Sequence, residues 1–441
     1  MRRRWELARA IGMAAALGAP CAVDAVDFDY QVGVGIEHND NVLLTEDDET
    51  SADILEPKLG FNLNQQGSTI QASANGVLEY YEYLGGELSN QLRGQLNAHV
   101  NWTMIPERLD FTFEDALGLE PIDALEASNQ NNLQQTNVFG MGPTLSFRLG
   151  PTMRGQAELR YVTSHAEETP DFNTNRGIAA IRAIKDLDSS TFISANADYE
   201  YVRFTDADAF DPNYGRSTVF GRYSRKWAKL DFTADAGWNW VNYTSGLIDD
   251  RDEPLARVTA AWHATDRSTF TANAAYQYSD SATDMLTDMT FIGGVPGSIT
   301  QGVVVGTSQA FLERTLRVGY GYAGDRLSAT FQPYYRKLDY LQLPLVPDLL
   351  GANQTARGVL GSFSWILRPL LTASLGGTWD KTHYDTVDRE DKTWTVTAAL
   401  KQQWTRNWSG ELSYTHYDRS SDAIGASSDQ NVVYVAVTYT R

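Results

Sequence analysis

Apolar and polar residues alternate one by one over many short stretches of the chain. In the segment 229–243, KLDFTADAGWNWVNY, every second residue from 230 to 240 is aliphatic, aromatic or alanine, and Asp231 and Asp235 stand between them. A β-strand places two such sets on opposite faces. The same period recurs in 90–102, 192–201, 269–279 and 392–400. Helical spacing of apolar residues is scarce, so the pattern predicts an all-β protein.

The connections between these stretches alternate between short and long. Tight turns such as 106–108 and 265–268 alternate with longer segments such as 118–132, 244–253 and 384–390. Nine short turns and ten long loops connect 20 strands. Short turns at one end, long loops at the other and an even strand count are typical of bacterial outer-membrane barrels. The sequence therefore predicts an antiparallel up-and-down transmembrane β-barrel of about 20 strands, with 18 as the alternative.

Two other all-β folds were weighed against the barrel. A soluble sandwich explains the period of two, but it gives no reason for every second connection to be short. A β-solenoid explains the repeat of about 20 residues, but its coils lack hairpin turns. In the barrel, the apolar set in 229–243 faces lipid, while Asp231 and Asp235 face a wet interior.

Aromatic side chains fall near the expected strand ends, as two interfacial girdles require. The girdle at the short turns is expected to contain Trp102, Trp227, Trp262, Trp404 and Trp408. The girdle toward the long loops is expected to contain Tyr199, Tyr201, Trp240, Tyr276, Tyr278 and Trp379.

The N-terminal residues predict an exported protein. Three arginines at 2–4 precede the short apolar run 10–19, and small residues at 23–25 favour cleavage after Ala25. A lipoprotein signal at Cys21 is the alternative, which Pro20 disfavours. We therefore expect residues 1–25 to be a signal peptide and residues 26–441 to form one barrel domain in the outer membrane.

Cleavage would leave an acidic chain without cysteine. Cys21 is the only cysteine, and the remaining 416 residues carry 32 basic and 54 acidic side chains, a net charge of about −22. Disulfides and thiol chemistry are therefore not expected. Nucleic acid is not expected as a partner either, because phosphate binding requires a basic surface.

Strand phase selects charged residues that are expected to face the barrel interior. The candidates are Arg93, Arg148, Arg154, Arg160, Arg216, Arg222, Arg257, Arg317, Arg336, Asp198, Glu200, Asp231 and Asp235. One interpretation is an arginine-lined track for an anionic solute or acidic polysaccharide, since guanidinium pairs well with carboxylate. The other is a wall on which opposite charges neutralise each other, as in any porin interior.

The long loops suggest what the outer surface and the interior contact. Acidic loops such as 46–49 and 249–253 are compatible with contacts to lipopolysaccharide through divalent cations, or with a merely solvated surface. The apolar loops 289–305 and 341–352 are unsuited to water, so we expect one or both to fold into the interior and narrow it. Membrane lipid and lipopolysaccharide are the partners that this surface implies.

We expect neither an enzyme nor a resident cofactor or metal. Four of the six histidines have an acid two residues on, His416 with Asp418 among them, and simple strand periodicity explains such a pair. The segment 38–41, HNDN, lacks the spacing of a calcium loop.

The stretch 32–63, VGVGIEHNDNVLLTEDDETSADILEPKLGFNL, carries a family resemblance. A glycine-rich first strand leads into Asp40-Asn41-Val42, an acidic loop and an apolar second strand. This stretch resembles outer-membrane barrels encoded with exopolysaccharide-secretion and exosortase-type gene clusters, a family grouped with the β-barrel porins. The resemblance implies a channel that exports an exopolysaccharide, with the polysaccharide and periplasmic export components as partners. A general diffusion porin and a surface scaffold with an occluded interior are the alternatives.

Overall fold

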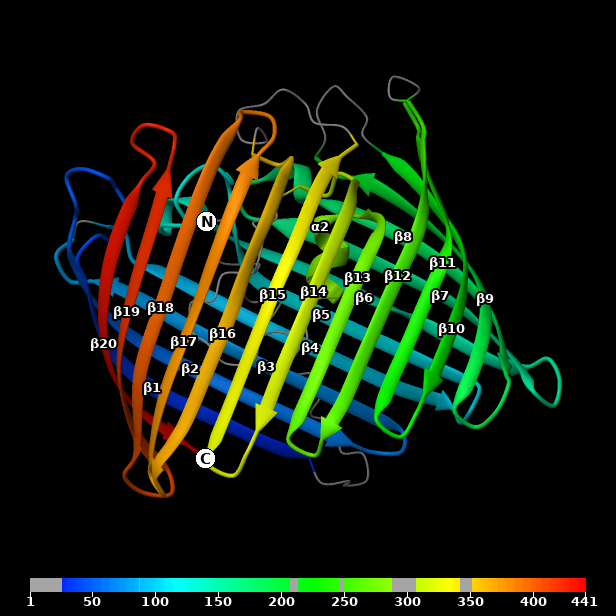
Figure 1. The fold of residues 1–441 in the computed structure, drawn as a ribbon, viewed down its shortest axis with the longest axis horizontal. Helices are drawn as coiled ribbons and strands as arrows, with labels where there is room; N and C mark the ends of the chain where they lie inside the picture. The colour runs from blue at the N-terminus through cyan, green and yellow to red at the C-terminus, as the bar shows by residue number, and fades with distance from the viewer. Residues whose placement is uncertain (1–25, 87, 207–212, 246–248, 288–306, 342–350) are drawn as a thin grey trace.

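In a computed structural model, the chain forms one closed antiparallel β-barrel of 20 strands (Figure 1). The structure describes residues 26–86, 88–206, 213–245, 249–287, 307–341 and 351–441. Each strand pairs with its neighbours in sequence, and β1 closes the barrel on β20. The predicted fold class and strand number are confirmed. The expected signal peptide, residues 1–25, lies outside the described residues.

The strands are 12 to 16 residues long, enough to cross a bilayer at a tilt. They are β1 (Asp27–Asn39), β2 (Ala52–Gln66), β3 (Ile70–Tyr83), β4 (Gln91–Ile105), β5 (Leu109–Pro121), β6 (Leu133–Arg148), β7 (Met153–Ala166), β8 (Thr174–Asp186), β9 (Thr191–Phe204), β10 (Tyr214–Lys226), β11 (Leu230–Tyr243), β12 (Arg251–Thr265), β13 (Ser268–Ser279), β14 (Phe311–Ala323), β15 (Leu327–Tyr340), β16 (Gln354–Arg368), β17 (Leu371–Tyr384), β18 (Arg389–Gln403), β19 (Trp408–Ser421) and β20 (Ser428–Thr440). Three short helical segments lie in long loops: η1 (Gln130–Asn132), η2 (Pro170–Phe172) and α2 (Ser281–Thr287). Among the described residues, no helix is long and apolar enough to cross a membrane.

The nine short turns and ten long loops lie at opposite ends of the barrel, because consecutive strands run in opposite directions. Several predicted loop bounds are wrong by two to four residues; the loop expected at 244–253, for example, ends at Asp250, because β12 begins at Arg251. The loop expected at 118–132 begins only at Ile122, since β5 continues to Pro121, which pairs with Leu133 of β6.

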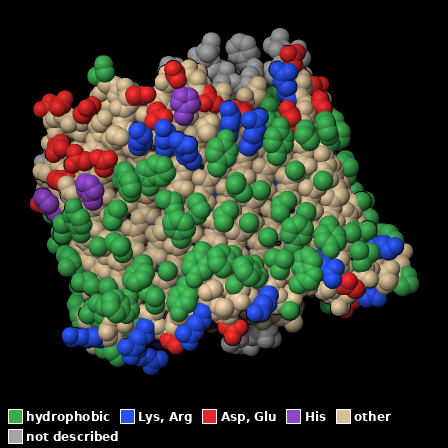
Figure 2. Space-filling view, viewed as in Figure 1, with side chains coloured by type: hydrophobic (Ala, Val, Ile, Leu, Met, Phe, Trp, Pro, Cys, Tyr) green, Lys and Arg blue, Asp and Glu red, His purple; other side chains and the backbone are tan. Residues whose placement is uncertain are grey.

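The two faces of the wall differ as the period of two requires. On β11, Trp238 is 42% exposed on the outside and Asp235 is 5% exposed on the inside. Figure 2 shows apolar side chains spread over the outer face between the two ends, with many acidic side chains toward the long-loop edge. Tyr278 is an exception to the predicted girdle. It is buried in an apolar cluster with Ala310 and Leu312.

The Asp40-Asn41 step closes the seam between the first and last strands. Asn41 is fully buried, and its Nδ2 donates to the carbonyl oxygens of Thr45 (2.8 Å) and Asp429 (2.9 Å). The carboxylate of Asp40 accepts hydrogen bonds from the backbone and side-chain nitrogens of Asn431 (2.7 and 2.8 Å). The motif that carries the family resemblance therefore ties the β1–β2 loop to β20.

Replacing Asn41 by alanine should lower the free energy of unfolding by about 1–3 kcal/mol, because the bonds of a fully buried amide to two carbonyl groups are lost. Urea unfolding of the refolded barrel in detergent micelles measures this loss. Asn64→Ala is the matched control, since the Asn64 side chain is exposed and accepts one bond from Gln66. Equal unfolding midpoints for both variants would contradict the role of Asn41.

Candidate channel interior

The loop between β13 and β14 enters the barrel near its long-loop end. Its described parts, residues 280–287 and 307–310, are called the inner loop below. Figure 1 shows α2 between the front and back walls of the barrel. Ala282 packs in an apolar cluster with Val138, Val162 and Phe172, side chains from β6, β7 and η2. Since β6 and β13 are seven strands apart in the barrel, the helix reaches across the interior.

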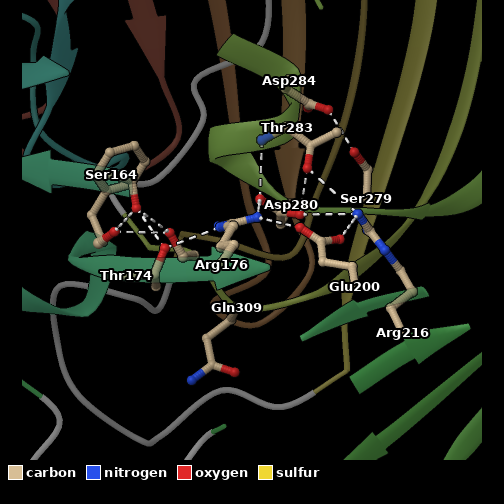
Figure 3. Close-up of polar contacts among 12 residues, drawn as sticks. Ser164, Thr174, Arg176, Glu200, Arg216, Ser279, Asp280, Thr283, Asp284 and Gln309 are labelled. Carbon is tan, nitrogen blue, oxygen red and sulfur yellow. Dashed lines mark hydrogen bonds and ion pairs between the residues drawn. The ribbon is translucent and has the colours of Figure 1, made fainter. Parts of the chain in front are cut away.

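Asp280, at the start of the inner loop, is held by two arginines of the wall. Its Oδ1 accepts a bond from Nη1 of Arg176 on β8 (2.6 Å), and its Oδ2 lies 3.4 Å from Nη2 of Arg216 on β10. Glu200 on β9 contacts the same two guanidinium groups at 3.3 and 2.5 Å. Asp280 also accepts from the backbone nitrogen of Thr283 (3.0 Å), which caps the helix. Figure 3 shows these four charged side chains converging at one place.

This group of four charges is almost completely shielded from solvent. Asp280 is 0% exposed and Arg176 is 2% exposed. Burial by itself would raise the pKa of Asp280, but the positive charges of Arg176 and Arg216 outweigh it and lower the pKa below its usual value. The aspartate of the inner loop is therefore a carboxylate at neutral pH. Nη2 of Arg176 is buried and has no hydrogen-bond partner.

A second aspartate ties α2 to the near wall. Asp284 accepts from the hydroxyl of Ser279 (2.7 Å) and pairs with Arg336 on β15, whose Nε also donates to Glu313 on β14 (3.2 Å). The inner loop thus bridges the walls formed by β6–β8 and by β14–β15.

The returning half of the inner loop is bound as well. The backbone nitrogen of Ser308 donates to the carbonyl of Asp171 (3.0 Å), and its hydroxyl donates to the carbonyl of Phe172 (2.9 Å). The hydroxyl of Tyr214 donates to the carbonyl of Ser308 (3.3 Å). Both described ends of the inner loop are therefore fixed to the wall.

The loop between β5 and β6, residues 122–132, also crosses the interior and is called the crossing loop. The hydroxyl of Tyr384 on β17 donates to the carbonyl of Ala124 (3.0 Å), and Nη2 of Arg419 on β19 donates to that of Leu125 (2.8 Å). Ala124 packs with Phe311, Leu338 and Tyr384, buried side chains of β14, β15 and β17. Two segments of the chain therefore span the barrel near its long-loop end.

Closer to the short turns, arginines and acids form a belt on the inner wall of β7–β12. Asp235 accepts from both Arg222 (2.7 and 2.9 Å) and Arg257 (2.9 Å). Arg160 donates to Glu158 (2.8 Å), and Arg182 donates to Glu158 (2.7 Å) and lies 3.8 Å from Asp198. The belt comprises Arg160, Arg182, Arg222, Arg257, Glu158, Asp198 and Asp235.

The remaining candidates do not join these groups. Arg148 lies beside a short turn, with its side chain 88% exposed, 4.0 Å from Glu107. Arg154 on β7 pairs with Asp186 on the neighbouring strand β8 (3.3 Å), also near the short turns. The other three are Arg93, which donates to Gln91 on its own strand, Asp231, which lies 3.7 Å from Lys226, and Arg317, which is half-buried on β14. The structure therefore does not form one continuous track through Arg148, Arg154 and Arg160.

Several residues of the interior were not predicted from the sequence, among them Arg176, Arg182, Asp280, Asp284 and Arg419. Arg176 has the same strand phase as Arg182, but apolar Ile178 and Ala180 stand between them and obscure the pattern on β8. Asp280 looks like one more acid of a long loop. The alternation along β8, in which every second residue faces the interior, is the sequence signal that predicts Arg176. The loops 289–305 and, for the most part, 341–352, which were expected to narrow the interior, lie outside the described residues.

The C-terminal strands match a known family. Residues 359–441, which contain most of β16 and all of β17–β20, match the family model described as "Putative beta-barrel porin 2". This part of the chain is porin-like. The match confirms the expected resemblance to β-barrel porins for residues 359–441; residues 32–63, which suggested the resemblance, lie outside the match. No curated protein matches the sequence.

Solved structures with a similar backbone include a receptor and an iron transporter. A mutant of the ferric enterobactin receptor from Pseudomonas aeruginosa, in complex with enterobactin, has a TM-score of 0.50 and 10% identity, over 95% of this chain and 82% of that chain. The FrpB iron transporter from Neisseria meningitidis has a TM-score of 0.47 and 10% identity, over 94% and 82%. At such identity the likeness is one of barrel fold. Across the described residues, no group of histidine and acidic side chains is arranged to hold a metal ion.

Proposed function

We propose that this protein is a channel of the bacterial outer membrane that exports an exopolysaccharide. The observation that carries the proposal is a closed 20-strand barrel with an apolar outer face and a charged inner wall. A barrel of this size encloses a water-filled space rather than a packed core. The porin match of residues 359–441 supports passage of a solute, and the resemblance of residues 32–63 supports a polysaccharide as that solute.

The inner loop and the crossing loop favour a channel that opens on a signal over a permanently open diffusion porin. Both are fixed by buried hydrogen bonds and ion pairs, so thermal motion alone does not displace them readily. A surface scaffold with an occluded interior is the second candidate. The same two loops favour it, because they cross the interior. Periplasmic export components and lipopolysaccharide are the partners in this proposal.

The proposal assigns no catalytic role to His416. The Nδ1 atom of His416, which has Asp418 at the i+2 position, lies 2.9 Å from Oδ1 of Asn431. An amide oxygen does not stabilise an imidazolium as the carboxylate of a catalytic triad does.

Planar-bilayer conductance tests the proposed function. The refolded barrel should conduct weakly. Replacing the crossing loop and the segment 280–310 by short turns should raise conductance roughly tenfold, since unobstructed barrels of comparable strand number hold an aqueous channel. High conductance of the unmodified protein would instead indicate a general diffusion porin. A folded but non-conducting double-loop variant would contradict a channel and favour the scaffold.

A further inference from the structure

We propose that Arg176 and Arg216 form a binding site for a carboxylate group of an acidic saccharide, and that Asp280 of the inner loop occupies this site while the interior is closed. The inference rests on the proposed function and names the ligand chemistry of that channel. Asp280 would act as an internal substitute for the ligand. The first argument is geometric. Two guanidinium groups from different strands, β8 and β10, converge on one carboxylate.

The charge balance of the wall is the second argument. Without Asp280, the buried wall group comprises Arg176, Arg216 and Glu200 and carries a net charge of +1. An unpaired charge is expensive to bury, so this group requires one further anion whenever the inner loop is absent. Carboxylate is the anion that it binds in this structure, and guanidinium pairs readily with carboxylate geometry.

The third argument is unused hydrogen-bonding capacity. Nη2 of Arg176 is buried without a partner while Asp280 is in place. A single aspartate therefore leaves a donor of the site unsatisfied. A uronic-acid residue carries hydroxyl groups next to its carboxylate and offers acceptors for both arginines and for this spare donor.

The belt extends the same chemistry toward the short turns. Arg182 on β8 and Arg222 on β10 each lie six residues beyond Arg176 and Arg216, about 20 Å along the strands. Four arginines and three acids give the belt a net charge of +1 as well. Two net-positive groups along one wall fit a chain with repeated acidic groups better than a single small anion.

Isothermal titration of the refolded barrel with oligogalacturonate, an acidic saccharide, tests the site. Asp280→Asn retains an oxygen to cap Thr283 but removes the competing charge. It should bind oligogalacturonate roughly tenfold to a hundredfold tighter than the unmodified protein, the range of one charge-assisted interaction. Arg216→Gln added to this variant should abolish the gain. Asp188→Asn, an equal charge change in an exposed short turn, is the control and should change nothing.

Because Asp280→Asn could leave the loop seated, a second variant replaces residues 280–310 by a short turn. It should bind oligogalacturonate and should not bind neutral malto-oligosaccharide or inorganic phosphate at the same concentration. Equal binding of acidic and neutral saccharides, or no binding by either variant in a folded barrel, would overturn the carboxylate site.

Conductance measured in parallel separates the two proposals. Selective binding without conductance would support the carboxylate site and contradict the channel. Conductance without a preference for acidic saccharides would support the channel and contradict the carboxylate site.

Discussion

Replacing Arg176 by alanine should lower the free energy of unfolding by about 3–5 kcal/mol, the cost of removing one partner of a buried ion pair. The loss leaves the carboxylates of Asp280 and Glu200, both buried, with Arg216 as their remaining cation. The inner loop should detach from β8 as a result. Urea unfolding in detergent measures the first effect, and protease sensitivity of the inner loop measures the second.

Arg154→Ala is the matched control, because Arg154 pairs with Asp186 where both side chains are about half exposed. An exposed pair contributes about 1 kcal/mol or less. The double variant Arg176→Ala with Asp280→Ala should recover part of the loss, since it removes one of the unpaired carboxylates. A loss for Arg176→Ala no larger than that for Arg154→Ala would show that the buried group does not hold the loop.

Replacing Gly142 by alanine should lower the free energy of unfolding by about 3 kcal/mol, the upper end of the range for overpacking. A Cβ atom at this position would lie 1.9 Å from the carbonyl oxygen of Leu159. The obstacle is backbone, so no side-chain rotation relieves it. The ladder between β6 and β7 is already interrupted at Gly142 and Pro143, and proline has no N–H to pair.

The fraction of protein that migrates as folded barrel on unheated gels, together with the urea midpoint, checks this result. Gly177→Ala is the control, since nothing lies within 4 Å of a Cβ atom placed there. Equal yield and stability for the two variants would contradict a steric requirement at Gly142. The site is relevant to function because β6 carries Val138, which packs against the inner loop.

The pairing of charges on the inner wall affects which solutes the proposed channel prefers. Most inward arginines contact an acid, as Arg222 and Arg257 contact Asp235. A fully neutralised wall would have little preference among solutes. The inner-loop group differs because one of its acids, Asp280, belongs to a loop rather than to the wall. Displacing the inner loop removes one partner of Arg176 and of Arg216, whereas Arg222 and Arg257 keep Asp235.

The sequence by itself determined the barrel. The period of two assigned Trp238 to the outside and Asp235 to the inside of β11, because side chains of a strand alternate between faces whatever the rest of the chain does. The alternation of short and long connections determined the topology and the strand number, since an up-and-down outer-membrane barrel has its short turns at one end and its long loops at the other. Both are local properties, which a single sequence shows directly.

Only the tertiary structure decided what crosses the interior. Asp280 and Arg176 are 104 residues apart, and the contact of Arg419 with Leu125 joins residues 294 apart. No periodicity relates such positions. The acceptor at Leu125 is moreover a backbone carbonyl, which every residue carries, so its side chain gives no sign of the contact. Loop conformation depends on which wall residues the closed barrel brings opposite each other, and that is defined only when β1 meets β20.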